Sequence, residues 1–188
     1  LALGVEVIYL NSNKINSGIY EVEASFNHTN KNYNKIGSKK ASLTINKASI
    51  QVSFDNSSFL YDGLEKSLYI EGELPSGYLI NYRGNNKVDA GEYTVTVSFS
   101  GQNSNYVLLN DLTAILTIEK ADYDMTSVSF NDKTFVYDKT EKTLLISGIL
   151  PFGVSVSYST NTLLNVGKVI VIAEFFSQSK NYNSIQNK

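Results

Sequence analysis

Apolar and polar residues alternate along several short stretches of this chain, and alternation with a period of two predicts β-strands. The clearest stretch follows Gly91, where one row holds Tyr93, Val95, Val97 and Phe99 and the other holds Glu92, Thr94, Thr96 and Ser98. Because successive side chains of a strand point to opposite faces, the first row is expected to be buried and the second to face water.

The same middle part of the chain predicts five more extended pieces, at residues 50–54, 59–61, 66–70, 78–82 and 114–118. Turn residues such as Asp62-Gly63 and Leu74-Pro75 separate them. No segment of helical length shows an apolar period of 3.6 residues. The pattern therefore predicts an all-β fold of small immunoglobulin-like β-sandwich units. A β-grasp-like unit is the alternative, which the lack of a predicted helix disfavours.

The alternating pattern recurs at a fixed spacing, which indicates a tandem repeat. Residues from Gly18 to Ile45 reappear in kind and order from Gly91 to Ile118, 73 positions later. A third copy keeps Gly167, 76 positions after Gly91. We therefore predict three domains: residues 1–46 as the C-terminal part of a first repeat, 47–119 as a complete repeat, and 120–188 as a third repeat lacking its last strand. Both ends of the sequence then fall inside repeats, as if cut from a longer protein.

The repeats are predicted to follow one another without a flexible tether. Glu119-Lys120-Ala121 joins the second copy to the third, and Asn46-Lys47-Ala48 joins the first to the second. Neither join is rich in Gly, Ser or Pro. Short joins of this kind restrict rotation, so the expected arrangement is an elongated rod.

The composition of the chain argues against most catalytic, metal-binding and nucleic-acid-binding functions. The 188 residues carry a net charge of −2, a single histidine and no cysteine. A nearly neutral chain offers no basic surface for nucleic acid, and a lone histidine without cysteine leaves little for a zinc site or a nucleophilic pair. His28 is expected in a solvent-exposed loop. We therefore expect no enzyme activity, cofactor or metal, and no membrane insertion, since the apolar runs are too short to span a bilayer.

The spaced residues of the middle copy resemble the MBG and YDG-type tandem repeats of bacterial surface proteins and adhesins. The shared elements are Lys47-Ala48, Tyr61-Asp62-Gly63, Leu74-Pro75-x-Gly77, Tyr82, Asn85, Asp89-Ala90-Gly91-x-Tyr93, Phe99, Asn105-Tyr106 and Leu116-Thr117-Ile118-x-Lys120-Ala121. The third copy has Lys139 where Gly63 stands. The resemblance implies an extracellular β-domain of a secreted or cell-wall-anchored bacterial protein, connected with adhesion or mucin binding. It implies no catalytic residues.

Several aromatic and aliphatic residues are candidates for specific roles. Tyr93 lies two residues after Gly91 at the start of a long strand, the placement of a tyrosine corner, and Tyr20 repeats it; core-edge packing is the alternative for both. Most tyrosines, Tyr9 among them, are expected to point inward. Tyr69 is expected to point outward and is the candidate for ligand contact.

One strand of the third copy is unusual because both of its faces are apolar. Its outward row carries Ile170, Ile172 and Phe176, where the other copies carry polar residues. An apolar outer face predicts a covering neighbour, so these three residues are the candidate interface. The sequence as a whole predicts a structural module of an extracellular stalk whose partners are neighbouring repeats. The alternative is an adhesion module that contacts host mucin or other extracellular glycans.

Overall fold

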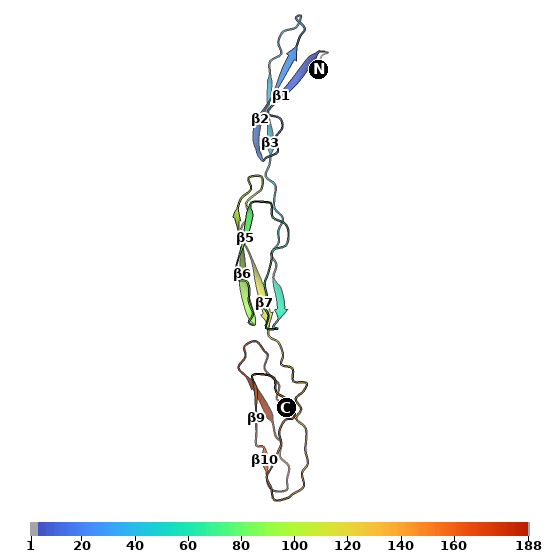
Figure 1. Ribbon diagram of the computed structural model, residues 1–188, viewed down its shortest axis with the longest axis vertical. Helices are drawn as coiled ribbons and strands as arrows, with labels where there is room; N and C mark the ends of the chain where they lie inside the picture. The colour runs from blue at the N-terminus through green and yellow to red at the C-terminus, as the bar shows by residue number, and fades with distance from the viewer. Residues whose placement is uncertain (1–3, 188) are drawn as a thin grey trace. The chain divides into compact units, whose positions relative to one another are not determined.

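The computed structural model describes residues 4–187, and within that range the protein contains strands and no helix (Figure 1). The strands are β1 (Val5–Leu10), β2 (Gly18–His28), β3 (Lys39–Ile45), β4 (Ser57–Leu60), β5 (Tyr78–Arg83), β6 (Gly91–Gly101), β7 (Leu112–Glu119), β8 (Lys142–Thr143), β9 (Val154–Tyr158), β10 (Thr162–Leu163) and β11 (Ala173–Ser177). The prediction of an all-β fold is confirmed at this level. No helix in the described range is long and apolar enough to cross a bilayer.

The chain divides into two compact units. One comprises Leu1–Phe54, Tyr69–Arg83 and Thr96–Thr113, and the other comprises Asp55–Leu68, Gly84–Val95 and Ala114–Lys188. The division passes through β6 and β7. The repeat boundaries expected from the sequence rest on the spacing of recurring residues and not on contacts in space, and they stay a prediction.

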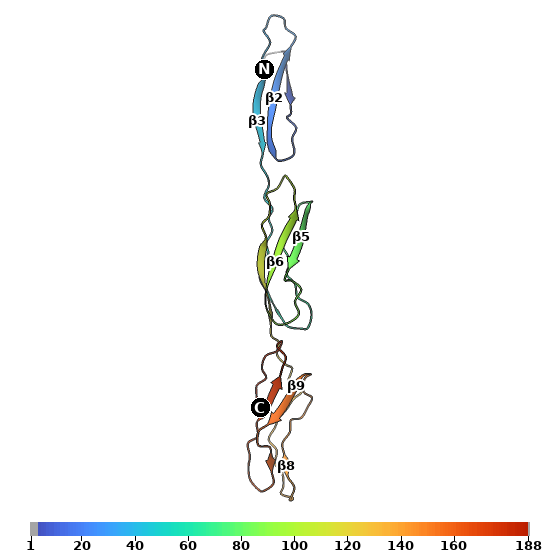
Figure 2. The same cartoon turned by 90° about the vertical axis from the view of Figure 1, so that its left-hand side faces the viewer.

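The first unit contains a three-stranded antiparallel sheet in the order β1-β2-β3. The long strand β2 is shared between two partners. β3 pairs with its first half, from Gly18 opposite Ile45 onward, and β1 pairs with its second half, ending at Val5 opposite His28. Figure 2 shows β2 and β3 side by side. In the same unit, β5 pairs with the second half of β6, which is the arrangement of β1 on β2.

The second unit contains three strand pairs. β4 lies parallel to β7, with Ser57 opposite Leu116. β9 and β11 are antiparallel, as are the two-residue strands β8 and β10. The strands of the middle repeat form one four-stranded sheet in the order β4-β7-β6-β5, so β7 lies between β4 and β6.

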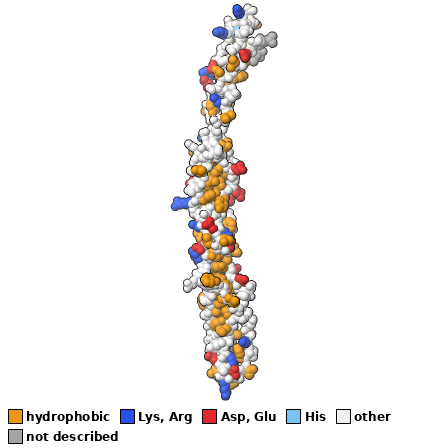
Figure 3. All heavy atoms as spheres, in the orientation of Figure 1, with side chains coloured by type: hydrophobic (Ala, Val, Ile, Leu, Met, Phe, Trp, Pro, Cys, Tyr) orange, Lys and Arg blue, Asp and Glu red, His pale blue; other side chains and the backbone are white. Residues whose placement is uncertain are grey.

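The buried core is small and falls where the alternation predicts. Val95, Val97 and Leu116 are fully buried, and Ala114 and Ile118 are nearly so. In the third repeat, Val128, Ala173 and Phe175 form a second buried cluster. Many other large apolar side chains reach the surface (Figure 3). The middle and third repeats therefore depend on few buried residues, and no hydrophobic residue between positions 4 and 46 is buried.

Two predicted strands are not strands. Residues 50–54 and 66–70 make only isolated bridges, Ser53 to Glu71 and Lys66 to Lys87. Their alternation still sets which side chains are buried, since Phe54 and Leu68 lie in the core. Tyr9 was expected to point inward, yet it is 63% exposed: no residue of β1 is buried. His28 was expected in an exposed loop, yet it ends β2 and is half-buried.

Candidate functional site

One set of recurrent polar residues gathers where one predicted repeat meets the next. We call the first of these places joint 1, formed by residues 16–18, 48 and 105–107, and the second joint 2, formed by residues 89–91, 121 and 181–183. The members of joint 2 lie 73 or 76 positions after those of joint 1. Each joint lies within a single compact unit.

Joint 1 is held by the side-chain amide of Asn105. Its Oδ1 accepts a hydrogen bond from the Ser17 backbone N–H at 2.7 Å. Its Nδ2 donates to Asn16 Oδ1 at 3.0 Å. One asparagine thus uses its acceptor and a donor on two adjacent residues of the preceding repeat.

Joint 2 repeats this clasp atom for atom. Asn181 Oδ1 accepts from the Ala90 backbone N–H at 2.8 Å, and Asn181 Nδ2 donates to Asp89 Oδ1 at 2.9 Å. We refer to the paired bonds of Asn105 and of Asn181 as the asparagine clasp. Two occurrences at equivalent positions indicate that the clasp belongs to the repeat.

Backbone hydrogen bonds add a second connection at each joint. At joint 1, Ala48 donates to the Asn105 carbonyl and accepts from the Val107 N–H, both at 2.9 Å. At joint 2, Ala121 donates to the Asn181 carbonyl at 3.0 Å and accepts from the Asn183 N–H at 2.8 Å. The linker residue of each join is therefore fixed to the loop that carries the clasp.

The tyrosine corner is present at both joints. The Tyr20 hydroxyl donates to the Asn16 carbonyl at 2.9 Å, and the Tyr93 hydroxyl donates to the Asp89 carbonyl at 2.9 Å. A Cβ added at Gly91 would lie 3.2 Å from the Tyr93 hydroxyl oxygen, so the glycine leaves room for the ring. The corner bond thus fixes the loop that the clasp grips.

Joint 2 carries a charge that joint 1 lacks. Lys180 Nζ lies 2.8 Å from Asp89 Oδ2, whereas joint 1 has the neutral Asn16 in the equivalent place. The Lys180 ammonium, and after it the Asn181 amide, hold the pKa of Asp89 below its ordinary value. Joint 2 also stacks two rings, Tyr123 on Tyr182, with centroids 4.2 Å apart.

The remaining recurrent polar residues hold loops within a repeat. The Asn85 side chain accepts from the Leu68 N–H at 2.8 Å and donates to its carbonyl at 2.7 Å. The Tyr82 hydroxyl accepts from the Ile70 N–H at 2.9 Å. These side chains take the place of a neighbouring strand, which explains why residues 66–70 are extended without belonging to a sheet. Asn161 and Tyr158 repeat two of these bonds in the third copy.

The candidate contact residues from the sequence lie apart from the joints. Tyr69 is 68% exposed, with its ring edge-on to Tyr82. Ile170 is 79% exposed and Ile172 43%, and both precede β11. Phe176 lies on β11 and is 51% exposed. Their outward direction agrees with the alternation, and their roles stay predictions.

His28 bonds to the backbone of the loop that follows β2. Its Nε2 lies 3.0 Å from the Asn34 carbonyl oxygen. Over residues 4–187, no group of three or more His, Asp or Glu side chains is placed to hold a metal ion.

Sequence reasoning missed the clasp, although its signal was present. Asn32, Asn105 and Asn181 recur at the repeat spacing in a loop that looked merely polar. Comparisons with family models, with curated proteins and with solved structures find no match. The joints themselves are therefore the main evidence for what the chain does.

Proposed function

We propose that this chain is a non-enzymatic structural module, a row of β-repeats that forms part of an extracellular stalk of a bacterial surface protein. The observation that carries the proposal is the asparagine clasp, made with the same atoms at both joints. The resemblance of the repeat to MBG and YDG-type repeats supplies the cellular setting.

A stalk requires joints that hold successive repeats in a fixed orientation. Each joint makes two clasp bonds and two backbone bonds, and one hydrogen bond contributes roughly 0.5–1.5 kcal/mol net. The joins contain no Gly/Ser/Pro-rich tether that would let the repeats turn freely. Recurrent residues committed to joints and loops are what a structural role demands, whereas a catalytic role demands free functional groups in a cleft.

The rigidity of joint 2 can be measured directly because the chain has no native cysteine. Spin labels at Glu92→Cys and Glu174→Cys, both exposed, flank the joint. Pulsed electron–electron double resonance measures the distance between the two labels. The distance distribution should be narrow in the parent and broader in Asn181→Ala. Asn187→Ala, a change at an exposed asparagine, should leave the distribution narrow.

A distribution in the parent that is already as broad as in Asn181→Ala would contradict the stalk. The joints would then be flexible linkers, and the row of repeats could not hold a direction.

A second candidate function is adhesion to mucin or other extracellular glycans, and Tyr69 is the observation that favours it. An exposed ring held edge-on by a neighbour is a surface on which a sugar can stack. On a mucin-coated surface, Tyr69→Ala should reduce retention of the chain. Leu79→Ala, at an equally exposed side chain (69%), should not. Equal retention of all three proteins, or none, would remove this candidate.

A further inference from the structure

The third repeat has a groove at the place where the middle repeat has a strand. In the middle repeat, β7 lies between β4 and β6. The residues equivalent to β4 and to the start of β6 lie 76 positions later, at 133–136 and 167–172. Among the described residues of the third repeat, no strand lies between these two segments.

The two segments line one cavity of about 510 Å³. Residues 132–137 form one wall, residues 163–169 and Val171 form another, and Leu144 is also part of the lining. The cavity thus occupies the position that corresponds to β7 in the middle repeat.

The segment beside the cavity has lost its strand pairing. β6 begins at Gly91, but its counterpart β11 begins only at Ala173, six positions after the equivalent Gly167. β9 pairs with β11 from Ala173 onward, as β5 pairs only with the second half of β6. The first half of this strand depends on a β7-like partner, and residues 167–172 have none in the third repeat.

Apolar side chains are uncovered along the same groove. Val95 is fully buried in the middle repeat, whereas its counterpart Val171 is only half-buried. Leu68 is 5% exposed, whereas its counterpart Leu144 is half-buried. Phe135 is 40% exposed beside them. The middle repeat shows what covers such residues, namely β7 with Ala114, Leu116 and Ile118 buried.

We propose that this groove is an acceptor site for one extended β-strand of the β7 type, the closing strand of a repeat of this kind. The strand enters antiparallel to residues 167–172 and parallel to residues 133–136. The register of β2 with β3 sets the expected register of this strand. The residue equivalent to Ile118 lies opposite Gly167, the one equivalent to Leu116 opposite Val169, and the one equivalent to Ala114 opposite Val171. Strand addition of this kind takes affinity from main-chain hydrogen bonds and specificity from alternate side chains.

Both faces of the incoming strand find matching neighbours. In the first repeat, Glu21 lies opposite Ser42; the equivalent positions are Ile170 in the third repeat and Ile115 in β7. The proposed strand therefore brings an isoleucine beside the exposed Ile170. This cross-strand apolar pair gives Ile170, one of the candidate interface residues, a specific neighbour.

The charge of the groove suits the acidic end of the β7 sequence. Three lysines, Lys133, Lys142 and Lys168, line the cavity with one carboxylate, Asp132. Lys142 is already paired with Asp138, so Lys133 and Lys168 are the positive charges that the groove offers to the strand. β7 ends at Glu119, whose Oε1 accepts from the Ser58 hydroxyl at 2.6 Å in the middle repeat. Thr134, the counterpart of Ser58, supplies a hydroxyl at the same place in the third repeat.

A synthetic peptide with the sequence of Leu112–Glu119 and polar flanks tests the proposal on the full 188-residue chain. Titration calorimetry should show one-to-one binding. A peptide of the same composition with each apolar–polar pair exchanged, and a peptide N-methylated at alternate residues, should bind at least tenfold more weakly. These controls separate strand pairing from general stickiness without altering the protein.

Two variants locate the site. Val171→Lys, inside the groove, should weaken binding at least tenfold, whereas Phe152→Lys, a change at a fully exposed phenylalanine outside the cavity lining, should leave binding unchanged. Amide exchange by nuclear magnetic resonance should show that the peptide protects residues 168–172 and leaves residues 18–22 of β2 as they were.

Several results would overturn the proposal. They are the absence of binding, equal binding of the N-methylated peptide, and protection at β2 or β3 in place of residues 168–172. Protection of residues 168–172 by self-association of the chain, in the absence of peptide, would also overturn it, because the groove would then take a second copy. None of these outcomes bears on the rigidity of joint 2, so the stalk proposal stands or falls separately.

Discussion

Gly72 and Gly148 hold equivalent turns, and each sits where only glycine fits. Their φ angles are 105° and 98°, in a region that side-chain-bearing residues rarely adopt. A Cβ would lie 2.5 Å from the Gln51 carbonyl oxygen at the first position and 1.8 Å from that of Ser127 at the second. The turns need the glycines both for dihedral angle and for space.

Gly148→Ala should lower the free energy of unfolding of the third repeat by about 2–4 kcal/mol, since it combines backbone strain with a clash against main chain. Gly153→Ala is the matched control, because Gly153 also has a positive φ, 78°, but nothing within 4 Å of an added Cβ. It should cost only about 1 kcal/mol. Urea unfolding compares the two, and equal losses would show that strain alone decides.

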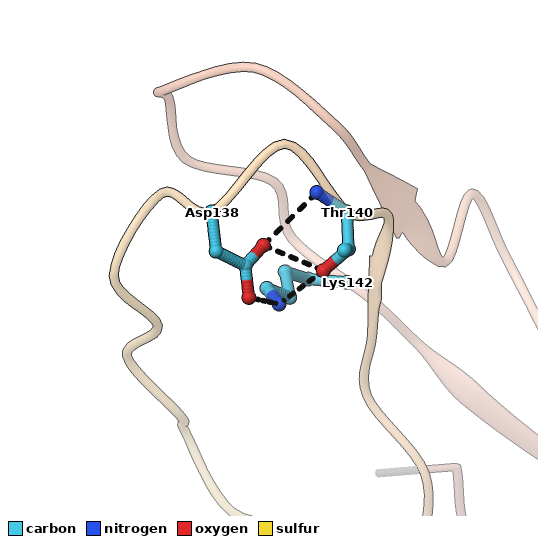
Figure 4. A network of polar contacts seen from close by, with 3 residues as sticks. All are labelled: Asp138, Thr140 and Lys142. Atoms are coloured by element: carbon cyan, nitrogen blue, oxygen red, sulfur yellow. Dashed lines mark hydrogen bonds and ion pairs between the residues drawn. The ribbon is translucent and has the colours of Figure 1, made fainter.

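A second residue-scale feature is the polar network at Asp138, drawn in Figure 4. Lys142 Nζ lies 2.5 Å from Asp138 Oδ2, and the Thr140 hydroxyl and N–H both donate to Oδ1. The lysine first, and then these two donors, lower the pKa of Asp138 from 3.8 to about 2. Asp62 and Lys66 make the same ion pair in the middle repeat.

The network predicts a pH-dependent contribution to stability. Because folding lowers the pKa of Asp138, the charged form stabilises the native state above pH 3.8, and the contribution is lost as the pH falls through about 2. Asp138→Asn should therefore lower the melting temperature at pH 7 and match the parent below pH 2. The effect should be small and shrink in 1 M salt, since the pair is exposed. A difference that persists below pH 2 would point to another cause.

At the scale of elements, the loop that carries the clasp connects the two halves of each joint. The Ala90 N–H bonds to the Asn181 side chain across 91 positions of sequence. Ser17 makes the equivalent bond with Asn105. Each backbone amide therefore reports on one joint.

Asn181→Ala should raise the hydrogen-exchange rate of the Ala90 amide about fivefold to tenfold, which corresponds to the loss of roughly 1 kcal/mol. The Ser17 amide, held by the intact joint 1, should exchange at its parent rate. Asn105→Ala should produce the reverse pattern. Nuclear magnetic resonance measures both amides in one sample, and parallel changes at both would mean that the variants loosen the chain generally.

Sequence predicted the elements best where alternation and sheet partners coincide. β5, β6 and β7 lie close to residues 78–82, 91–99 and 114–118, because each is paired with a neighbouring strand and β6 and β7 also carry buried rows. The prediction of a strand at residues 66–70 was wrong because the side chains of Asn85 and Tyr82, and not a neighbouring strand, bond to their backbone. The apolar–polar alternation of a sequence does not show which partner supplies such bonds. The clasp was out of reach for a related reason: recurrence marks Asn181, but its partner Asp89 is 92 positions away.

At the scale of the whole molecule, the middle and third repeats each have their own buried residues, so stability should be distributed along the chain. In repeat proteins, stability is close to a sum of terms for each unit and for each interface. Leu116 is fully buried in the middle repeat, while its counterpart in the first repeat, Leu43, is only half-buried. The two leucines therefore probe cores of different completeness.

Leu116→Ala should destabilise the middle repeat by about 2–5 kcal/mol, whereas Leu43→Ala should cost distinctly less, because a half-buried side chain leaves a smaller cavity. Calorimetry should show more than one melting transition, with Leu116→Ala shifting only one of them. A single transition that moves as a whole would show that the chain unfolds as one cooperative body.

The parallel pairing of β4 with β7 has a mechanical consequence. The chain enters the middle repeat through residues 47–56, which lead into β4, and leaves it directly after β7; β4 and β7 are hydrogen-bonded neighbours. Tension on the two ends would pull parallel neighbours in opposite directions along their length. The hydrogen bonds between them would then be loaded together in shear instead of breaking one at a time. The two strands nearest the ends of the repeat would therefore resist its extension.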